Sequence, residues 1–478
     1  MDSESLSLRD PDGRLHMVDG RVIRWVKELK SETFNNFLRS DFVDANVSNG
    51  KLVQTNALAS EEGETIRQHL LSKSLDGGEI AGSVYEHNRL EFISYPYEWP
   101  ASMFLSAARL TLDLARDAMK SGYRMKDATP YNVLFEGPRP VFVDALSFEE
   151  RPAGDPIWAA EGQFLRMFLL PLLAERDFSL EASSLLALHR DGVQPDVLYQ
   201  MYGKTELFSP SVLRYVALPV WLAKKADDPT FYDQKLLENT DRADFIYQQI
   251  FKRLHKAVNA VAPKSTGRSH WVDYMSGLSY SDDGFSQKEQ FVSRALEAIK
   301  PKRVMDVGAN TGHFSFLAAR AGASVLSMDF DAKSVDAIWH QANEEGLNIL
   351  PLMQNIADPS PAMGWRNHET KSFLERASGN FDLVMMLAVI HHLMLTNGIP
   401  LEEVVDLASE LSRDYCIIEY VGAEDPMRQR LRRGRAEIDN SITRERFEAA
   451  CSKKFVIEKS ENVTGSDRVL YLLKKVSV

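Results

Sequence analysis

Downstream of residue 262, short apolar runs alternate with segments of helical hydrophobic spacing. The short runs are typical of buried strands, and the 3.6-residue spacing between them is typical of helices that pack on a sheet. Such alternation indicates a parallel sheet with helices on both faces, an α/β fold. A capping box of Ser286 and Glu289 would begin the first helix. We predict strands at 303–308, 324–330, 349–355, 381–387 and 415–421, helices at 286–299, 313–322 and 332–346, and a closing antiparallel pair at 455–461 and 468–475.

The first 262 residues have a mixed pattern that favours an α+β arrangement. Apolar stretches around glycine turns predict short strands within 13–26 and 47–55. Residues 102–122 have the spacing of an amphipathic helix that ends at a glycine, and 131–148 read as a hairpin. Pro, Gly, Ser and Thr collect at 261–270, so we predict two domains, 1–262 and 263–478.

Composition narrows the classes of function. The chain has 478 residues and a net charge of -12, a balance that disfavours nucleic acid and anionic membrane surfaces as partners. No apolar run approaches the roughly 20 residues of a membrane span. Two cysteines, Cys416 and Cys451, form neither a disulfide framework nor a zinc pattern, and the polar N-terminus is unlike a secretory signal. These features favour a cytoplasmic location.

The stretch "VMDVGANTGHF" (304–314) lies between a predicted strand and a predicted helix. Its two glycines, Gly308 and Gly312, allow a sharp turn and the close approach of a ligand. The next strand ends in Asp329, where nucleotide-type sites place a carboxylate that accepts ribose hydroxyls. No Lys-Ser/Thr pair follows Gly312, which excludes a P-loop, although the glycines alone also fit a turn that binds nothing.

With these motifs in order, residues 270–478 resemble a class I S-adenosylmethionine-dependent methyltransferase, which implies a Rossmann-like sheet. "LMQNIAD" is similar to the family's third-strand motif, with Asn355 at its adenine-contacting acidic position, and "MMLAVIHHL" is similar to its fourth-strand motif. An asparagine can still bond adenine, its amide oxygen accepting from the exocyclic amine. The resemblance implies a cofactor site made of Asp306, Gly308, Asn310, Gly312, Asp329, Phe330, Asn355, Ile356 and Leu387.

Trp271, "DPSPAMGW" (358–365) and "AVIHHL" (388–393) further resemble the nodulation-type methyltransferase subfamily, which also has a long N-terminal region. Substrate-facing candidates are Tyr274, Tyr280, Trp365 and Glu419. A core position is the simpler interpretation of Trp365, and a loop cap is the alternative for Glu419. No Asn/Asp-Pro-Pro-Tyr box follows the fourth strand, which disfavours methylation of a nucleobase nitrogen.

Catalytic candidates are His391 and His392, because they follow the fourth strand at the sheet edge where such folds bind ligands. A histidine has a pKa suited to proton removal near neutrality. We expect one to be structural and one functional, with His392 as the base and His391 bonded to backbone; Glu419 or Tyr280 would be next in line. Five arginines within 427–435 form a solvated helix face or, alternatively, grip an anionic substrate.

"MKDATPYNVLF" (125–135) contains Asp127 and Asn132, and Asp144 follows within a predicted hairpin. This spacing resembles the catalytic loop of aminoglycoside phosphotransferase-like kinases, in which an Asp orients the acceptor and an Asn and a second Asp bind Mg²⁺. The family's loop His is replaced by Met125, "DALSF" replaces its Asp-Phe-Gly, and no glycine-rich loop is found in 1–60. A kinase-like scaffold and an active kinase that uses Mg-ATP are the two interpretations.

The sequence therefore predicts an S-adenosylmethionine-dependent methyltransferase that acts on an oxygen of a small or medium-sized metabolite. The alternatives are a bifunctional kinase–methyltransferase and a non-catalytic module that binds the cofactor or a partner. The sequence predicts no resident metal and does not indicate the oligomeric state.

Overall fold

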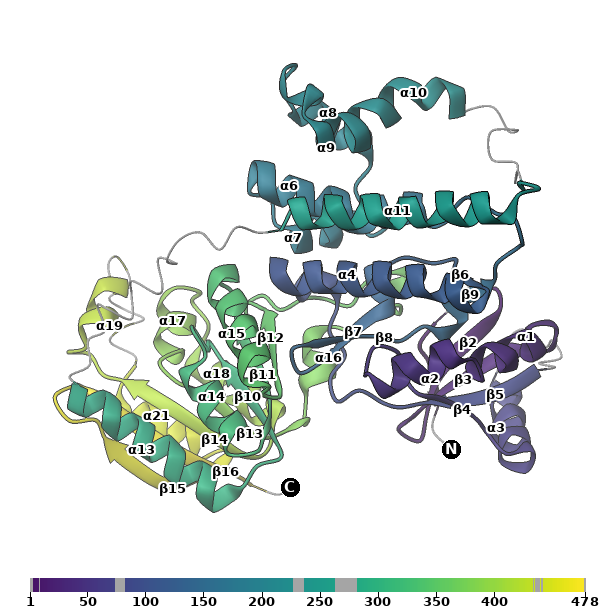
Figure 1. The fold of residues 1–478 in the computed structure, drawn as a ribbon. Helices are drawn as coiled ribbons and strands as arrows, with labels where there is room; N and C mark the ends of the chain where they lie inside the picture. The colour runs from purple at the N-terminus through teal and green to yellow at the C-terminus, as the bar shows by residue number, and fades with distance from the viewer. Residues whose placement is uncertain are drawn as a thin grey trace. The chain divides into compact units, whose positions relative to one another are not determined.

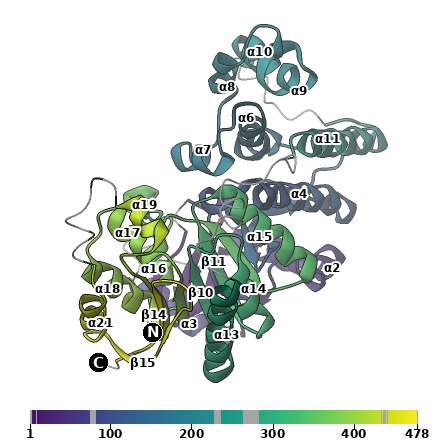
Figure 2. The same cartoon turned by 90° about the vertical axis from the view of Figure 1, so that its left-hand side faces the viewer.

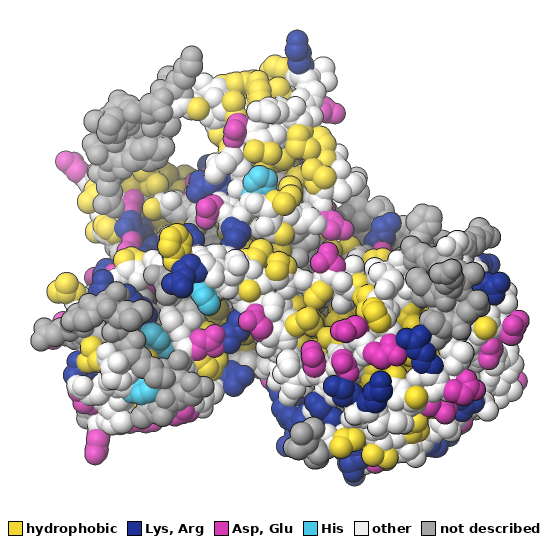
Figure 3. All heavy atoms as spheres, turned by 180° about the vertical axis from the view of Figure 1, so that it is seen from behind, with side chains coloured by type: hydrophobic (Ala, Val, Ile, Leu, Met, Phe, Trp, Pro, Cys, Tyr) yellow, Lys and Arg dark blue, Asp and Glu magenta, His cyan; other side chains and the backbone are white. Residues whose placement is uncertain are grey.

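The computed structural model describes residues 3–7, 9–73, 82–226, 236–262, 282–432, 434, 439 and 442–476. The chain forms two compact units by its internal contacts. The first comprises 1–135 and 140–264, and the second comprises 136–139 and 265–478. No helix among the described residues has the length and apolarity needed to cross a bilayer. Acidic and basic side chains are interspersed over the face of the molecule drawn in Figure 3.

The first unit begins with a five-stranded antiparallel sheet in the order β1-β2-β3-β5-β4 (Figure 1). Strands β2 and β3 form a hairpin around Asp19 and Gly20, which both have positive φ, as a two-residue hairpin turn requires. The prediction of a strand at 47–55 is wrong over most of that range. Its first residues belong to helix α2, which continues to Ser48. The strands are β1 Ser3–Ser5, β2 Gly13–Val18, β3 Arg21–Lys27, β4 Thr55–Ala57 and β5 Gly82–His87, with helices α1 Glu28–Leu38, α2 Asp41–Ser48 and α3 Ser60–Lys73.

A helical part follows the sheet within the first unit. Helix α4 (Ala101–Ala118) buries a continuous apolar face and ends in a short turn closed by Gly122 at φ 80°, so the predicted helix is confirmed. The predicted hairpin is also present, as β7 (Val133–Glu136) and β8 (Arg139–Phe142). The remaining elements are β6 Tyr123–Met125, β9 Phe148–Glu150, α5 Glu161–Phe164, α6 Leu170–Phe178, α7 Ala182–Leu188, α8 Pro195–Met201, α9 Pro210–Val212, α10 Leu218–Ala226 and α11 Thr240–Ala260.

The second unit contains a seven-stranded sheet in the order β12-β11-β10-β13-β14-β16-β15. Its first five strands are parallel, and β16 and β15 are added antiparallel, so the predicted strands and the closing pair are confirmed. Figure 2 shows α14 and α15 on one side of this sheet and α17 and α18 on the other. The strands are β10 Arg303–Val307, β11 Ser324–Asp329, β12 Ile349–Met353, β13 Phe381–Met386, β14 Ser412–Val421, β15 Phe455–Asn462 and β16 Arg468–Lys475.

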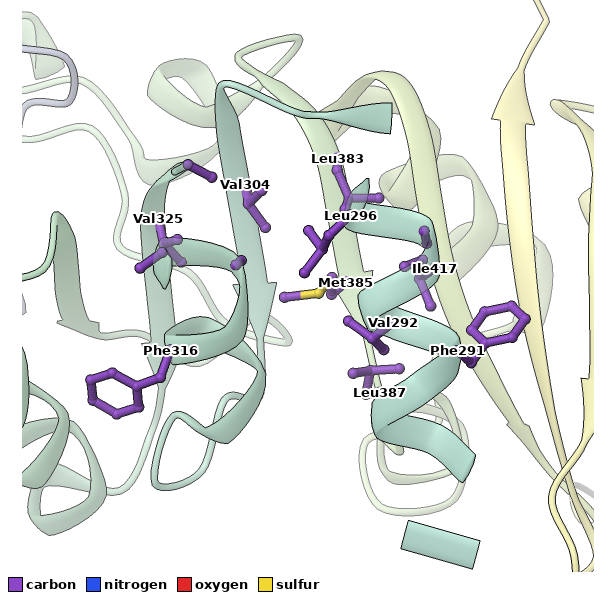
Figure 4. Packing of buried hydrophobic residues seen from close by; sticks show 14 of the residues in the cluster. Phe291, Val292, Leu296, Val304, Phe316, Val325, Leu383, Met385, Leu387 and Ile417 are labelled. Atoms are coloured by element: carbon purple, nitrogen blue, oxygen red, sulfur yellow. The ribbon is translucent and has the colours of Figure 1, made fainter. Parts of the chain in front are cut away.

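The first helix of this unit, α13 (Asp282–Ile299), already includes Ser286, so the predicted capping box does not begin it. Its apolar face, with Val292 and Leu296, packs over β10 and β13 in one hydrophobic cluster (Figure 4). This cluster fixes the strands, and their C-terminal ends therefore have defined positions. The other helices are α14 His313–Arg320, α15 Ala332–Glu345, α16 Phe373–Ala377, α17 Ile390–Leu395, α18 Leu401–Leu411, α19 Pro426–Leu431 and α21 Arg444–Cys451.

Candidate cofactor and acceptor site

A tight turn joins β10 to α14 and has no room for side chains at its two glycines. Gly308 and Gly312 have φ values of 69° and 84°. A Cβ at 308 would lie 2.7 Å from Val389 Cγ2, and one at 312 would lie 2.8 Å from Ile338 Cγ1. Real Cβ atoms do not approach other carbons so closely, because this is well inside van der Waals contact. The turn therefore requires glycine at both positions, as the sequence predicted.

Asp306 stabilises this turn from inside. Its carboxylate is buried and accepts a 2.6 Å hydrogen bond from the Ser315 hydroxyl, which also lies 3.0 Å from the Ser327 hydroxyl. Burial raises the pKa of Asp306 to about 6, against the lowering effect of the Ser315 bond. Asp306 thus links the turn to the first residues of α14 and to β11.

Asp329, the last residue of β11, links the turn to the neighbouring strand. One carboxylate oxygen accepts the Asn310 backbone N–H at 2.8 Å and the other accepts that of Asp331 at 3.0 Å. Burial is the main cause that raises its pKa. Each carboxylate oxygen has a second lone pair, so Asp329 can still accept a hydrogen bond from a ribose hydroxyl.

Asn310 gives a direct sign that the turn faces a ligand. It adopts φ 51°, and its buried amide oxygen has no hydrogen-bond partner among the residues that the structure describes. A buried acceptor without a partner is costly, about 1–3 kcal/mol. A bound donor such as an amino or hydroxyl group would satisfy it, so the turn fits S-adenosylmethionine.

The other residues assigned to the cofactor differ in what they offer. Phe330, next to Asp329, is exposed, and Ile356 is half-buried after β12. The Asn355 amide oxygen accepts the Ala357 backbone N–H at 3.1 Å, so it is already engaged in a local turn. The Leu387 side chain belongs to the hydrophobic cluster and is buried, which leaves only its backbone to face a ligand.

Two adjacent imidazoles lie just beyond the C-terminal end of β13. Helix α17 begins at Ile390, and its His391 and His392 rings have centroids 4.3 Å apart. His391 is 2% exposed, and neither ring nitrogen has a hydrogen-bond partner within the described part of the chain. The expected bond from His391 to the backbone is therefore not found among the described residues.

Both imidazoles are held in their neutral form. Burial, followed by the charges of His392, Arg468, Arg428 and Lys288, places the pKa of His391 well below its usual 6.5. Burial and the charge of Arg468 lower the pKa of His392. Near pH 7 each ring thus has one nitrogen that can accept a proton.

Glu419 on β14 is not available to a substrate. It is fully buried and lies between two cations, 2.7 Å from Lys288 Nζ and 3.2 Å from an Arg468 guanidinium nitrogen. Arg468 continues this chain of ion pairs to Asp425 at 2.7 Å. A carboxylate that is fully buried and paired in this way is not accessible, so its predicted roles as substrate ligand or reserve base are wrong.

Arg428 also departs from the sequence-based interpretation. It is 1% exposed; its Nε pairs with Asp439 at 2.6 Å, and another of its nitrogens donates to the Val421 carbonyl at 2.9 Å. It is therefore a core residue and neither part of a solvated face nor free to grip an anion. Arg433 and Arg435 of the same segment lie outside the described residues.

The aromatic substrate candidates are only partly placed. Trp365 is 66% exposed, so the core interpretation is wrong. An exposed indole can still cover a bound molecule. Trp271, Tyr274 and Tyr280 lie outside the described residues.

In the first unit, the kinase-like residues Asn132 and Asp144 come together with residues that the sequence did not single out, and the Asn132 amide nitrogen lies 3.5 Å from the Asp127 backbone carbonyl. The Asn132 amide donates to the Ser147 hydroxyl at 2.9 Å, and that hydroxyl donates to Asp144 at 2.5 Å. Arg24 forms an ion pair with Asp144 at 2.8 Å. No group of three or more His, Cys, Asp or Glu among the described residues is arranged to hold a metal ion. Arg24 and Ser147 belong to no sequence motif, so only the tertiary structure shows that they contact Asp144.

Comparisons with known proteins identify a methyltransferase domain in the second unit. A family model described as "Methyltransferase domain" matches residues 280–450. The nodulation protein NoeA of Rhizobium meliloti (strain 1021) is 30% identical over 470 residues, covering 98% of this chain and 95% of the relative.

Two further likenesses cover less of the chain. The O-antigen chain terminator bifunctional methyltransferase/kinase WbdD of Escherichia coli is 29% identical over 152 residues, which are 30% of this chain and 18% of the relative. The structure of magnesium protoporphyrin IX methyltransferase (ChlM) from Synechocystis PCC 6803 with bound SAH covers 44% of this chain and 90% of its own, with 17% identity and a TM-score of 0.30.

The similarity to NoeA extends over both units, and the methyltransferase match falls within the second unit, where the glycine turn and the two imidazoles lie. The second unit is thus an S-adenosylmethionine-dependent methyltransferase domain, preceded by a kinase-like region. The chain belongs to the family of the nodulation protein NoeA.

Proposed function

We propose that the protein methylates an oxygen atom of a small or medium-sized metabolite, with His392 as the general base. The observation that carries this proposal is the pair of neutral imidazoles beside the cofactor turn. Val389, two residues before His391, is the residue that a Cβ on Gly308 would strike. The imidazoles therefore follow closely in sequence after a residue that packs against the glycine turn.

Several residues of the second unit would hold the cofactor. Asp329 would accept the ribose hydroxyls, the Asn310 amide oxygen would accept from an amino or hydroxyl group, and Asn355 with Ile356 would flank the adenine. When bound, S-adenosylmethionine supplies an electrophilic methyl group on its sulfonium sulfur. The chain's own residues have to align the acceptor with that group.

An oxygen acceptor explains why two neutral imidazoles lie there. The pKa of a hydroxyl is far above neutrality, so a hydroxyl gains more than an amine from a base that removes its proton as the new bond forms. His392 is half-buried and has a lowered pKa, and its free nitrogen would take that proton. His391 is more deeply buried, and it would position the acceptor through a hydrogen bond.

The test is transfer of a radiolabelled methyl group to a panel of hydroxyl, carboxyl and amino compounds. We expect labelled oxygen acceptors, and we expect His392→Ala to lower kcat by about 10²–10⁴-fold, the usual contribution of a general base. The affinity for S-adenosylmethionine, measured by calorimetry, should stay the same. His340→Ala is the matched control, because His340 on α15 has a side chain that is 62% exposed.

Other outcomes would favour other functions. Label on amino compounds, or wild-type turnover by His392→Ala, would contradict the oxygen acceptor with a histidine base. Binding of S-adenosylmethionine without transfer to any compound would favour a non-catalytic module.

A further inference from the structure

Arg24, on β3 of the first unit, is a buried cation that contacts three other parts of that unit. It is 5% exposed. Its Nε donates to His87 Nε2 at 3.0 Å, and its two terminal nitrogens lie 3.3 Å from an Asp10 oxygen and 2.8 Å from an Asp144 oxygen. All three guanidinium nitrogens therefore have partners. We call Asp10, Arg24, His87, Asn132, Asp144 and Ser147 the Arg24 cluster.

The protonation of His87 supports a fixed role for Arg24. Because Nε2 accepts from Arg24, the hydrogen of the neutral ring must be on Nδ1, which lies 2.8 Å from the Thr55 hydroxyl. Burial and the Arg24 charge place the pKa of His87 well below 6.5. The imidazole is thus a neutral acceptor that orients the guanidinium toward the two carboxylates.

Both oxygens of Asp144 are already engaged. Oδ1 lies 2.8 Å from an Arg24 nitrogen in an ion pair that is not a hydrogen bond, and Oδ2 accepts the Ser147 hydroxyl at 2.5 Å. The Asn132 amide nitrogen donates to that same hydroxyl at 2.9 Å. The Asp and Asn at the positions where the resembled kinases bind Mg²⁺ are therefore joined through a serine, and Asn132 directs a donor group into the cluster.

A magnesium ion requires different surroundings. It takes oxygen ligands at about 2.0–2.1 Å in near-octahedral geometry. A guanidinium at hydrogen-bond distance from Asp144 occupies one side of that carboxylate and repels a second cation. The carboxylates of Asp10, Asp127 and Asp144 interact electrostatically, and two protein cations, Arg24 and Lys126, already act on them. The residues present do not fit a resident Mg²⁺.

We propose that Arg24 takes the place of the metal ion in the kinase-like region and holds Asp10 and Asp144 together as a permanent counter-cation. The first unit then does not transfer phosphoryl groups from Mg-ATP. An internal cation then neutralises these carboxylates, where an active kinase uses them to bind Mg²⁺ beside the phosphates of ATP.

The experiment compares Arg24→Gln with the wild type by thermal unfolding, with and without millimolar Mg²⁺ or Mn²⁺. Glutamine removes the charge and leaves Asp10 and Asp144 to repel each other. We expect a fall in Tm of about 10 °C, consistent with loss of a buried ion pair in a unit of this size. Divalent cations should recover at least half of this loss in Arg24→Gln and leave the wild-type Tm unchanged.

The matched control is Arg21→Gln, on the same strand. Arg21 pairs with Glu62 and Glu86, but its side chain is 36% exposed, so its removal should lower Tm little and show no cation-dependent recovery. Unchanged affinity for S-adenosylmethionine in both variants would show that the second unit is intact.

If Arg24→Gln does not fold, titration of the wild type with metal ions and with Mg-ATP still tests the proposal. Calorimetry with Mn²⁺ and with Mg-ATP should show no binding to the first unit. Binding that Asp144→Asn removes would overturn the proposal. So would an Arg24→Gln variant that folds with a lowered Tm and is not stabilised by either cation.

Discussion

Polar side chains that resemble catalytic residues have opposite surroundings in the two units. In the first unit, Asn132 donates to the Ser147 hydroxyl, and Asp144 accepts from that hydroxyl and forms an ion pair with Arg24, although its Oδ1 has no hydrogen bond among the described residues. In the second, the Asn310 amide oxygen and both His391 ring nitrogens are buried with no hydrogen-bond partner among the described residues. A partnered buried group stabilises the fold, whereas an unpartnered one costs about 1–3 kcal/mol that a ligand can offset. The Asp144 carboxylate thus has a counter-cation beside it, whereas the acceptors in the second unit have no described partner that would offset their burial.

The largest effect should come from Asp329→Ala, which removes the carboxylate that would hold the ribose. Two hydrogen bonds to a charged group contribute about 3 kcal/mol together, so we expect the Kd for S-adenosylmethionine to rise by about 100-fold or more. Calorimetry measures this. Asp336→Ala on α15 is the control, because its carboxylate lies near the surface beside His340. Unchanged affinity for S-adenosylmethionine in Asp329→Ala would contradict the proposal that this carboxylate holds the ribose.

Asp144→Asn should lower the stability of the first unit by about 2 kcal/mol. Breaking a buried ion pair costs 3–5 kcal/mol, but Arg24 keeps Asp10 and His87 as partners, which reduces the loss. Urea unfolding measures the change, and the affinity for S-adenosylmethionine should be unaffected. If the variant were as stable as the wild type, the bonds around Asp144 would not be what holds this region together.

His391→Leu should raise the stability of the protein, whereas Asp144→Asn should lower it. Replacing a buried imidazole that lacks partners by an apolar side chain should stabilise the ligand-free protein by about 1 kcal/mol. The same change should raise the KM for the methyl acceptor, because the positioning hydrogen bond is lost. Asn132→Leu is the matched variant in the first unit, and it should destabilise the protein because it leaves Ser147 without its donor. A loss of stability in His391→Leu would mean that the imidazole has a structural partner.

The smallest effect concerns pH. The folded protein holds His391 and His392 neutral, since their pKa values lie below 6.5 and Lys288, Arg428 and Arg468 repel an added proton. The unfolded chain takes up protons at these residues as pH falls through 6.5, and the folded chain does not. The stability that depends on neutral histidines is therefore fully present above pH 6.5. It is lost as pH falls toward the lowered pKa values.

Asp306 acts in the other direction, since its pKa is raised to about 6 and its contribution grows as pH falls. The measurement is thus the difference between the wild type and the His391→Leu/His392→Leu double variant, which should lose the histidine part of the slope. The acid limb of the kcat profile should likewise lie below pH 6.5. A limb at or above that value would contradict a base with a lowered pKa.

Sequence patterns predicted the elements of the second unit well, because strand–helix alternation and glycine turns are local signals. Local signals were less reliable where a neighbouring element decides the outcome. Ser286 and Glu289 form the sequence pattern of a capping box, yet α13 already begins at Asp282. Residues 47–55 look like a strand around a glycine, yet most of that stretch completes or follows α2.

In the candidate site, too, features set by local sequence could be predicted and features set by distant residues could not. The residues of the turn could be predicted because their spacing is fixed by a single β–α connection. The environment of Glu419 could not, because Lys288 and Arg468, which neutralise it, are 131 and 49 residues away along the chain. Arg24 in the first unit is similarly distant from Asp144. The absence of described partners for His391 is likewise a property of packing, to which no sequence motif corresponds.

The contact between Gly308 and Val389 has a mechanical consequence. There is no space for a methyl group between the cofactor turn and the start of α17, so these two segments form one tightly packed junction. A cofactor that fixes the turn would also fix the orientation of both imidazoles before an acceptor arrives. Binding free energies are reciprocal, so an acceptor that orders the imidazoles would tighten the hold on the cofactor by the same factor. The absence of a single side chain thus allows the packing that would couple the binding of the two molecules.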